Sequence, residues 1–191
     1  MKRRLVIRFN APVILSFALL ALLALLLGSW TDGATTYRFF SVYRSSLSDP
    51  LTYVRFFGHV LGHAGYDHYM GNMLLLLLVG PGIEEKYGHK TTALCIAVTA
   101  LVTGLVQFIF FPNTVLLGAS GIVFMMIVMS SLAGMKDGCI PITLILVLVL
   151  YIGGEIVDGV VLRDNISQLT HILGGICGLV FGFSIKRHRR R

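Results

Sequence analysis

The chain has 191 residues, of which 55% are hydrophobic and only 13% are charged, and its mean hydropathy is +0.82. Because soluble domains carry about 25% charged residues, this composition excludes an ordinary soluble domain and predicts a multi-pass integral membrane protein. The net charge of +7 gathers at the two ends of the chain, where it indicates topology and contact with anionic lipid, and we expect no nucleic-acid partner.

Six apolar segments predict membrane-spanning helices, since about 20 apolar residues cross the hydrocarbon layer. In chain order they cover residues 11–30, 68–83, 91–110, 116–134, 138–154 and 165–185. The first is too long for the core of a signal peptide and no small-x-small cleavage site follows it, so we expect it to be retained. A Phe-Pro-Asn-Thr turn at 111–114 divides the uncharged stretch after Lys90 into two spans. We therefore predict an all-α fold, one six-transmembrane-helix bundle over residues 1–191.

The segment between the first two spans, residues 31–67, carries aromatic side chains among charges. Such a mixture is typical of structure that lies in the membrane interface, so we expect an interfacial outer loop here. Lys and Arg set the orientation: an N-terminus in the cytoplasm places 12 of the 16 on the inside and 4 on the outside. Both termini are thus predicted to be cytoplasmic, in the inner or plasma membrane of a prokaryotic cell.

Polar residues cluster at one depth in three of the predicted helices. The second, fourth and sixth all start at the outer face and carry, within about 10 Å of it, His68 and Asn72, Ser120, and His171. His68 and Asn72 are spaced i, i+4 and share a helix face. A lone serine in a membrane helix is usually structural, but histidines there are rare and indicate function. Because the histidines lie at the same depth as the serine, the sequence predicts a functional site there.

Glycine spacing indicates which helices meet at this site. His171 begins a stripe of small residues, which allows close approach of a neighbouring helix, and Gly118 and Gly121 give the helix of Ser120 the same property; the stripe continues with Gly174, Gly178 and Gly182. If these two helices pack together, His171 can take the proton of Ser120 and make it a nucleophile. His68, Asn72 and the Ser120 backbone N–H are then placed to stabilise an oxyanion.

Taken in order, these residues resemble the rhomboid intramembrane serine proteases over essentially the whole chain. The matching stretches are HVLGHAGYDHYMGN at 59–72, GPGIEEKYG at 80–88, GASG at 118–121 and HILGGICGLVFG at 171–182. The resemblance implies a Ser120–His171 dyad without a third acid, an oxyanion hole from His68, Asn72 and the Ser120 amide, and cleavage of single-pass membrane proteins near the outer face. It implies no cofactor and no metal.

The resemblance also assigns supporting residues. It implies that His59 and His63 are structural hydrogen-bonders, although with His68 they could also be read as zinc ligands. Phe124 stands where the family often has an aromatic hydroxyl, so we expect its ring to stack on His171. The sequence departs from the family pattern at other positions too. Val54-Arg55 stands where the family often has Trp-Arg, Asp67 is unusual before His68, and Met125 and Met126 replace small residues.

Other functions compete with the protease. A rhomboid-like pseudoprotease would bind membrane proteins without cutting them, but such relatives usually lack one or both residues of the dyad. A histidine-based transporter or proton relay would need further ionisable residues in mid-span, and a zinc protease would need His-Glu-x-x-His, which is missing. Cys95, Cys139 and Cys177 have no metal-binding or redox spacing and are interpreted as packing residues. The oligomeric state stays open.

Overall fold

The computed structural model describes residues 10–133, 142, 145–146, 149 and 165–189. The regular elements among these residues are helices, apart from one isolated β-bridge, which confirms the all-α prediction. The elements are α1 (Pro12–Trp30), α2 (Ala34–Phe39), α3 (Pro50–Gly58), the 3₁₀ helix η1 (His59–Leu61), α4 (Tyr66–Tyr87), α5 (His89–Phe110), α6 (Ser120–Ala133) and α8 (Asn165–Arg189). The predicted span at 138–154 lies almost wholly outside the described residues.

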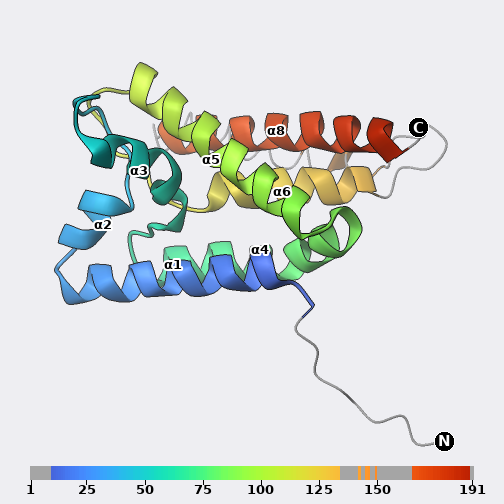
Figure 1. Cartoon of the computed structure of the whole chain (residues 1–191), viewed down its shortest axis with the longest axis horizontal. Coiled ribbons are helices and arrows are strands. Elements are labelled where there is room, and N and C mark those ends of the chain that lie inside the picture. Colours follow the sequence, from blue (N-terminus) through green and yellow to red (C-terminus); the bar gives the residue numbers. More distant parts are fainter. Residues whose placement is uncertain (1–9, 134–141, 143–144, 147–148, 150–164, 190–191) are drawn as a thin grey trace, which may run out of the picture.

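The helices form a bundle in which α1 packs on α4 and α6 packs on α8, while α5 crosses the bundle diagonally (Figure 1). The short helices α2 and α3 lie at one end, which we call the loop end. The start of α1 and the end of α8 lie at the opposite end, which we call the terminal end (Figure 1). Both ends of the described chain thus lie at the same end of the bundle.

Three of the described helical segments are long and apolar enough to cross a membrane, namely Pro12–Trp30, His89–Phe110 and Gln168–Ile185. α6 is apolar and has 14 residues within the part of the chain that the structure describes, fewer than a span needs. α4 has 22 residues, the same length as α5, but polar and charged residues at both ends keep it out of this group. The chain is therefore an integral membrane protein by its described helices, and the count of six spans remains a prediction.

Several helix boundaries differ from the predicted spans, and those of α4 and α6 do so for identifiable reasons. α4 starts at Tyr66 and runs to Tyr87, because the Glu-Glu-Lys sequence after the apolar run continues the helix. α6 begins at Ser120 and not at 116, because Leu116 exchanges two backbone hydrogen bonds with Val42 (2.9 and 3.0 Å) in an antiparallel bridge. That bridge holds the residues before Ser120 extended and ties them to the loop end.

The terminal end of the bundle is held by the last turn of α4. Glu84 is fully buried, and its carboxylate accepts hydrogen bonds from the backbone N–H groups of Val13 and Ile14, both at 2.9 Å. These are among the N–H groups that have no partner within α1, so Glu84 caps that helix from a distance. His89 approaches the same carboxylate at 2.5 Å. Because these contacts join α1, α4 and α5, Glu84 has a structural role.

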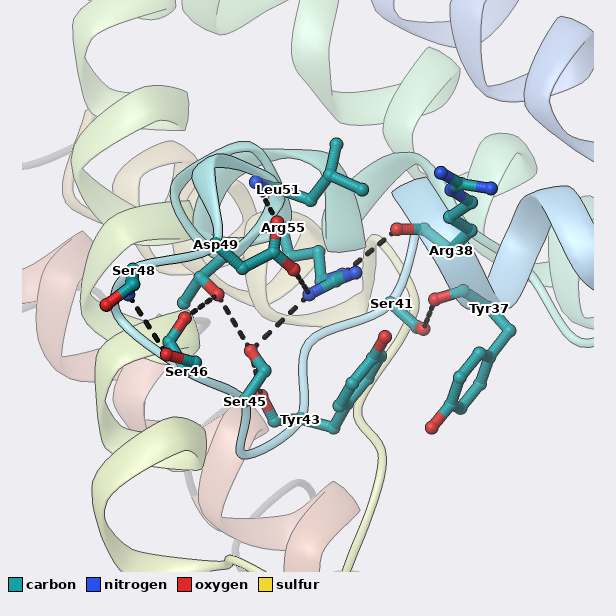
Figure 2. Close-up of polar contacts among 11 residues, drawn as sticks. Tyr37, Arg38, Ser41, Tyr43, Ser45, Ser46, Ser48, Asp49, Leu51 and Arg55 are labelled. Atoms are coloured by element: carbon teal, nitrogen blue, oxygen red, sulfur yellow. Dashed lines mark hydrogen bonds and ion pairs between the residues drawn. The ribbon is translucent and has the colours of Figure 1, made fainter.

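The loop end is organised around a buried arginine, Arg55 (Figure 2). Its side chain is 5% exposed and donates to the carbonyl of Arg38 (2.9 Å) and to the carboxylate of Asp49 (3.2 Å). The guanidinium also lies over the ring of Tyr43, 4.6 Å from its centroid. Asp49 at the same time caps α3 through the N–H of Leu51. Arg55 thus joins α2, α3 and the chain between them without help from position 54, whose valine is exposed.

Candidate active site

A cavity of about 340 Å³ opens between α4, α6 and α8. Its lining contains every group that the sequence predicted for the chemistry: Ser120, His171, His68 and Asn72. Asp67, Gly71, Leu75, Val123 and Phe124 complete the wall. The structure therefore brings together predicted residues that are far apart in the chain, with His68 and His171 separated by 103 positions (171 − 68).

Ser120 is the first residue of α6 and is half-buried. The first N–H groups of a helix have no partner within it, so the Ser120 amide lies at the positive end of the helix dipole. The turn before it needs Gly118, which has φ of +128°, and a Cβ there would lie 2.9 Å from the imidazole of His68. The Gly118 N–H donates to the carbonyl of His59 at 2.9 Å and fixes the turn.

His171 lies on α8 and stacks on Phe124 of α6. Their ring centroids are 4.4 Å apart and the ring planes differ by 6°, which confirms the predicted stacking. One turn further along α8, Gly174 touches the backbone of α6, because a Cβ there would lie 2.2 Å from the carbonyl oxygen of Gly121. Only a glycine permits this approach, so the small residues bring His171 to the start of α6.

The same contact continues along both helices. A Cβ on Gly178 would lie 2.5 Å from the carbonyl oxygen of Met125, and one on Gly182 would lie 2.5 Å from the side chain of Leu132. The predicted packing of the glycine stripe on the helix of Ser120 is therefore confirmed over about two turns. Met125 and Met126 are buried in the core beside it.

His68 and Asn72 lie one turn apart on α4. The Ala64 N–H donates to Nδ1 of His68 at 3.4 Å, so a neutral His68 carries its proton on Nε2. That nitrogen faces the turn at Gly118, since an added Cβ there would meet it at 2.9 Å. Asn72 is buried and its amide donates to the carbonyl of His68 at 2.9 Å. An amide has two N–H hydrogens, so one remains for a ligand. Both residues are donors at the cavity wall.

His59 and His63 do not line this cavity. The two nitrogens of His59 contact the carbonyl of Arg55 (3.1 Å) and the hydroxyl of Thr103 (3.2 Å). His63 contacts the carbonyl of Leu61 and packs edge-on against the ring of His68, with centroids 5.0 Å apart. Burial lowers the pKa of each to about 4, so both are neutral at pH 7. These contacts fit the structural role that the resemblance implies.

Metal ligation finds no support in the described part of the chain. It contains no group of three or more His, Cys, Asp or Glu side chains arranged to hold a metal ion. Both ring nitrogens of His59 already have partners, which argues against the zinc interpretation of the three histidines. Cys95 and Cys177 are buried free thiols, while Cys139 lies outside the described residues.

Four residues of the wall were not predicted from the sequence: Asp67, Gly71, Leu75 and Val123. Three of them follow the helical spacing i, i+4, i+8 and lie beside the stripe of His68 and Asn72. Once a helix at 66–87 is assumed, that spacing places Asp67 and Gly71 on the site face of α4. The helical period was thus the signal that could have found them.

Comparison with known proteins identifies the family. Residues 50–188 match the Rhomboid domain. The chain is 33% identical over 144 residues to Rhomboid-related protein 1 of Caenorhabditis elegans, which covers 69% of this chain and 39% of that protein. It is 28% identical over 160 residues to Rhomboid-related protein 2 of Mus musculus, which covers 73% of this chain and 53% of that protein. The chain thus spans between two-fifths and about half of the length of these relatives.

The domain match covers well over half of the 191 residues, and the cavity between α4, α6 and α8 lies within it. This chain belongs to the rhomboid family of membrane proteins.

Proposed function

We propose that this protein is an intramembrane serine endopeptidase that cleaves peptide bonds in or next to the transmembrane segments of single-pass membrane proteins. The observation that carries the proposal is the cavity that holds Ser120, His171, His68 and Asn72 together, with His171 stacked on Phe124. A serine, an imidazole and several hydrogen-bond donors around one space form the set that acyl transfer requires.

Catalysis begins when Nε2 or Nδ1 of His171 takes the proton from Ser120 Oγ and the oxygen attacks the carbonyl carbon of the substrate. His171 then gives that proton to the leaving amine, and a water molecule hydrolyses the acyl-enzyme by the reverse use of the same two groups. The stacked Phe124 ring holds the imidazole plane, so the dyad works without a third acid.

The tetrahedral intermediate carries an oxyanion that needs donors already in place. The Ser120 N–H at the start of α6, the Nε2–H of His68 and the free N–H of Asn72 supply them. Removal of one such donor lowers the rate by about 10²–10³.

The substrate must enter from the membrane and unwind, because a peptide bond in an intact helix is not open to attack. Ser120, His68 and His171 all lie in the first turns of their helices, at the loop end of the bundle, where water can reach the acyl-enzyme. With both termini in the cytoplasm, the loop end lies on the outer side of the membrane, and cleavage takes place there.

Cleavage of a model single-pass substrate by the purified protein tests the proposal. We expect cleavage by the wild type, none by Ser120→Ala or His171→Ala, and no effect of EDTA. Ser131→Ala is the matched control, because Ser131 lies in the same helix and donates to the carbonyl of Ile127, an ordinary structural serine. Cleavage that persists in Ser120→Ala contradicts the proposal, and binding without cleavage by the wild type indicates a pseudoprotease.

A further inference from the structure

The wall of the cavity on α4 has a feature that the catalytic mechanism does not use. Asp67, Gly71 and Leu75 follow one another at intervals of four residues, from the loop end inwards. The wall therefore presents a carboxylate, then a position without a side chain, then an apolar side chain. Neighbours in this stripe are separated by about 6 Å along the helix axis, at 1.5 Å per residue.

Gly71 leaves open space in this wall. A Cβ at this position would meet no heavy atom within 4 Å, in contrast to Gly118 and Gly174, where a Cβ would collide with the neighbouring segment. Packing of the described residues thus does not require a glycine here. The gap at Gly71 is room in the cavity that a side chain of the substrate can occupy.

Asp67 places a negative charge at the outer edge of this gap. Its side chain is exposed, and it forms no ion pair among the described residues, whose two salt bridges involve Asp49 and Glu84. In the first turn of α4 it also interacts favourably with the helix dipole. The dipole explains a carboxylate anywhere in that turn, but not the adjoining gap in the cavity wall.

A lysine or arginine side chain fits this surface. Its apolar stem spans about 6 Å and its charged head seeks the aqueous side of a membrane, the behaviour known as snorkelling. With the stem over the open space at Gly71, above the apolar side chain of Leu75, the head reaches Asp67 one interval of about 6 Å further along the helix. We infer that the stripe Asp67–Gly71–Leu75 is a specificity surface that selects membrane-protein substrates with a basic residue close to the cleaved bond; this inference rests on the proposed function.

A substrate series tests the inference. The residue at each of the three positions on either side of the cleaved bond is changed to Lys, Gln or Glu, and kcat/KM is measured. At one of these positions we expect kcat/KM to be about fivefold higher for the Lys substrate than for the Gln substrate, and lower for the Glu substrate than for the Gln substrate. A fivefold effect is the size expected for one exposed ion pair. The preference should shrink in about 1 M NaCl, where the screening length is about 3 Å.

Variants of the cavity wall distinguish the effect of the Asp67 charge from the effect of the open space at Gly71. Asp67→Lys should reverse the order of the Lys and Glu substrates, and Asp67→Asn should abolish the difference. Gly71→Leu should fold, since the space is open, but remove the advantage of the Lys substrate. Gly82→Leu is the matched control: it lies on the same helix, a Cβ there also meets nothing within 4 Å, and it does not line the cavity. It should keep the wild-type preference.

The outcomes distinguish the two proposals. Equal kcat/KM for the Lys, Gln and Glu substrates at all six positions, or an unchanged order in Asp67→Lys, overturns the specificity surface while leaving the protease intact. If Asp67→Asn lowers kcat/KM equally for all three substrates and also lowers the melting temperature, Asp67 only stabilises α4 through the helix dipole, and the inference is overturned. If no substrate is cleaved, the protease proposal fails, and dissociation constants of the same substrates for the Ser120→Ala protein still decide whether Asp67 selects a basic residue.

Discussion

Single residues in the cavity determine whether the dyad is aligned, and Phe124 is the clearest case. Its ring is parallel to the His171 imidazole at 4.4 Å. Phe124→Leu removes the stacking surface but keeps an apolar side chain of similar size, so the imidazole loses its fixed plane. We expect kcat to fall about ten- to hundredfold, the cost of a misplaced catalytic group, while Phe124→Tyr retains activity. Steady-state cleavage with melting temperatures as the folding control checks this, and equal activity of the Leu variant would contradict it.

His59 makes the stability of the fold depend on pH. Burial lowers its pKa from 6.5 to about 4, so between these values the unfolded chain binds a proton that the folded chain does not. Protonation of His59 in the unfolded chain therefore does not reduce the free energy of unfolding above pH 6.5. Below that pH it does, by at most about 1.4 kcal/mol for each pH unit between 6.5 and 4. Melting temperatures of wild type and His59→Gln between pH 7.5 and 4 measure it. As the pH falls, the melting temperature of the wild type should drop more than that of His59→Gln. Parallel plots of melting temperature against pH for the two proteins would show that His59 is not responsible.

At the scale of helices, the contact between α6 and α8 decides whether Ser120 and His171 can meet. Gly174→Ala would place a Cβ 2.2 Å from the Gly121 carbonyl oxygen and push the helices apart, whereas a Cβ on Gly175 would lie 3.9 Å from Val128, an ordinary contact. We expect Gly174→Ala to lose about 1–3 kcal/mol of stability and at least tenfold in kcat/KM, and Gly175→Ala to lose little. Gly174→Val should be worse and should lower activity more than expression.

Activity assays on equal amounts of folded protein, judged by melting temperature, compare the two glycine variants. If both behave like the wild type, close packing of α6 on α8 does not set the site.

The elements also show where prediction from the sequence reaches its limit. Apolar runs located both ends of α1 and α5 to within two residues, because the composition of these segments is dominated by apolar side chains, whereas α8 runs four residues past its predicted end. The start of α6 was four residues off, since the bridge between Val42 and Leu116 joins segments 74 positions apart (116 − 42) and leaves no local pattern. The Arg55 contacts with Arg38 and Asp49 are likewise tertiary.

The candidate site was predicted more completely than the loop end. His68, Asn72, Ser120 and His171 were placed by helix direction and depth, which need only span boundaries and charge asymmetry, and the structure puts all four in one cavity. Asp67 was noticed in the sequence without an interpretation, because its meaning depends on the open space at Gly71. Whether a glycine leaves open space depends on how its neighbours pack in three dimensions, so the residue type alone does not predict it.

The whole molecule has a predicted orientation that can be measured. The loop end, with Leu47 58% exposed, should face the outside, and the terminal end, with exposed Glu85, should face the cytoplasm. In a Cys139→Ser background, a membrane-impermeant maleimide should label Leu47→Cys in intact cells and Glu85→Cys only after permeabilisation. The remaining thiols, Cys95 and Cys177, are buried. The reverse labelling pattern would place the site on the cytoplasmic side and contradict the topology.

The central claim is that Ser120 is a nucleophile activated by His171. The most direct measurement is to react the folded protein with a fluorophosphonate and to locate the adduct by mass spectrometry of its peptides. We predict a single phosphonylated residue, Ser120, in the wild type and in Ser131→Ala, and no adduct in His171→Ala. An adduct on another serine, or equal labelling of Ser120 in the absence of the His171 imidazole, would contradict the account.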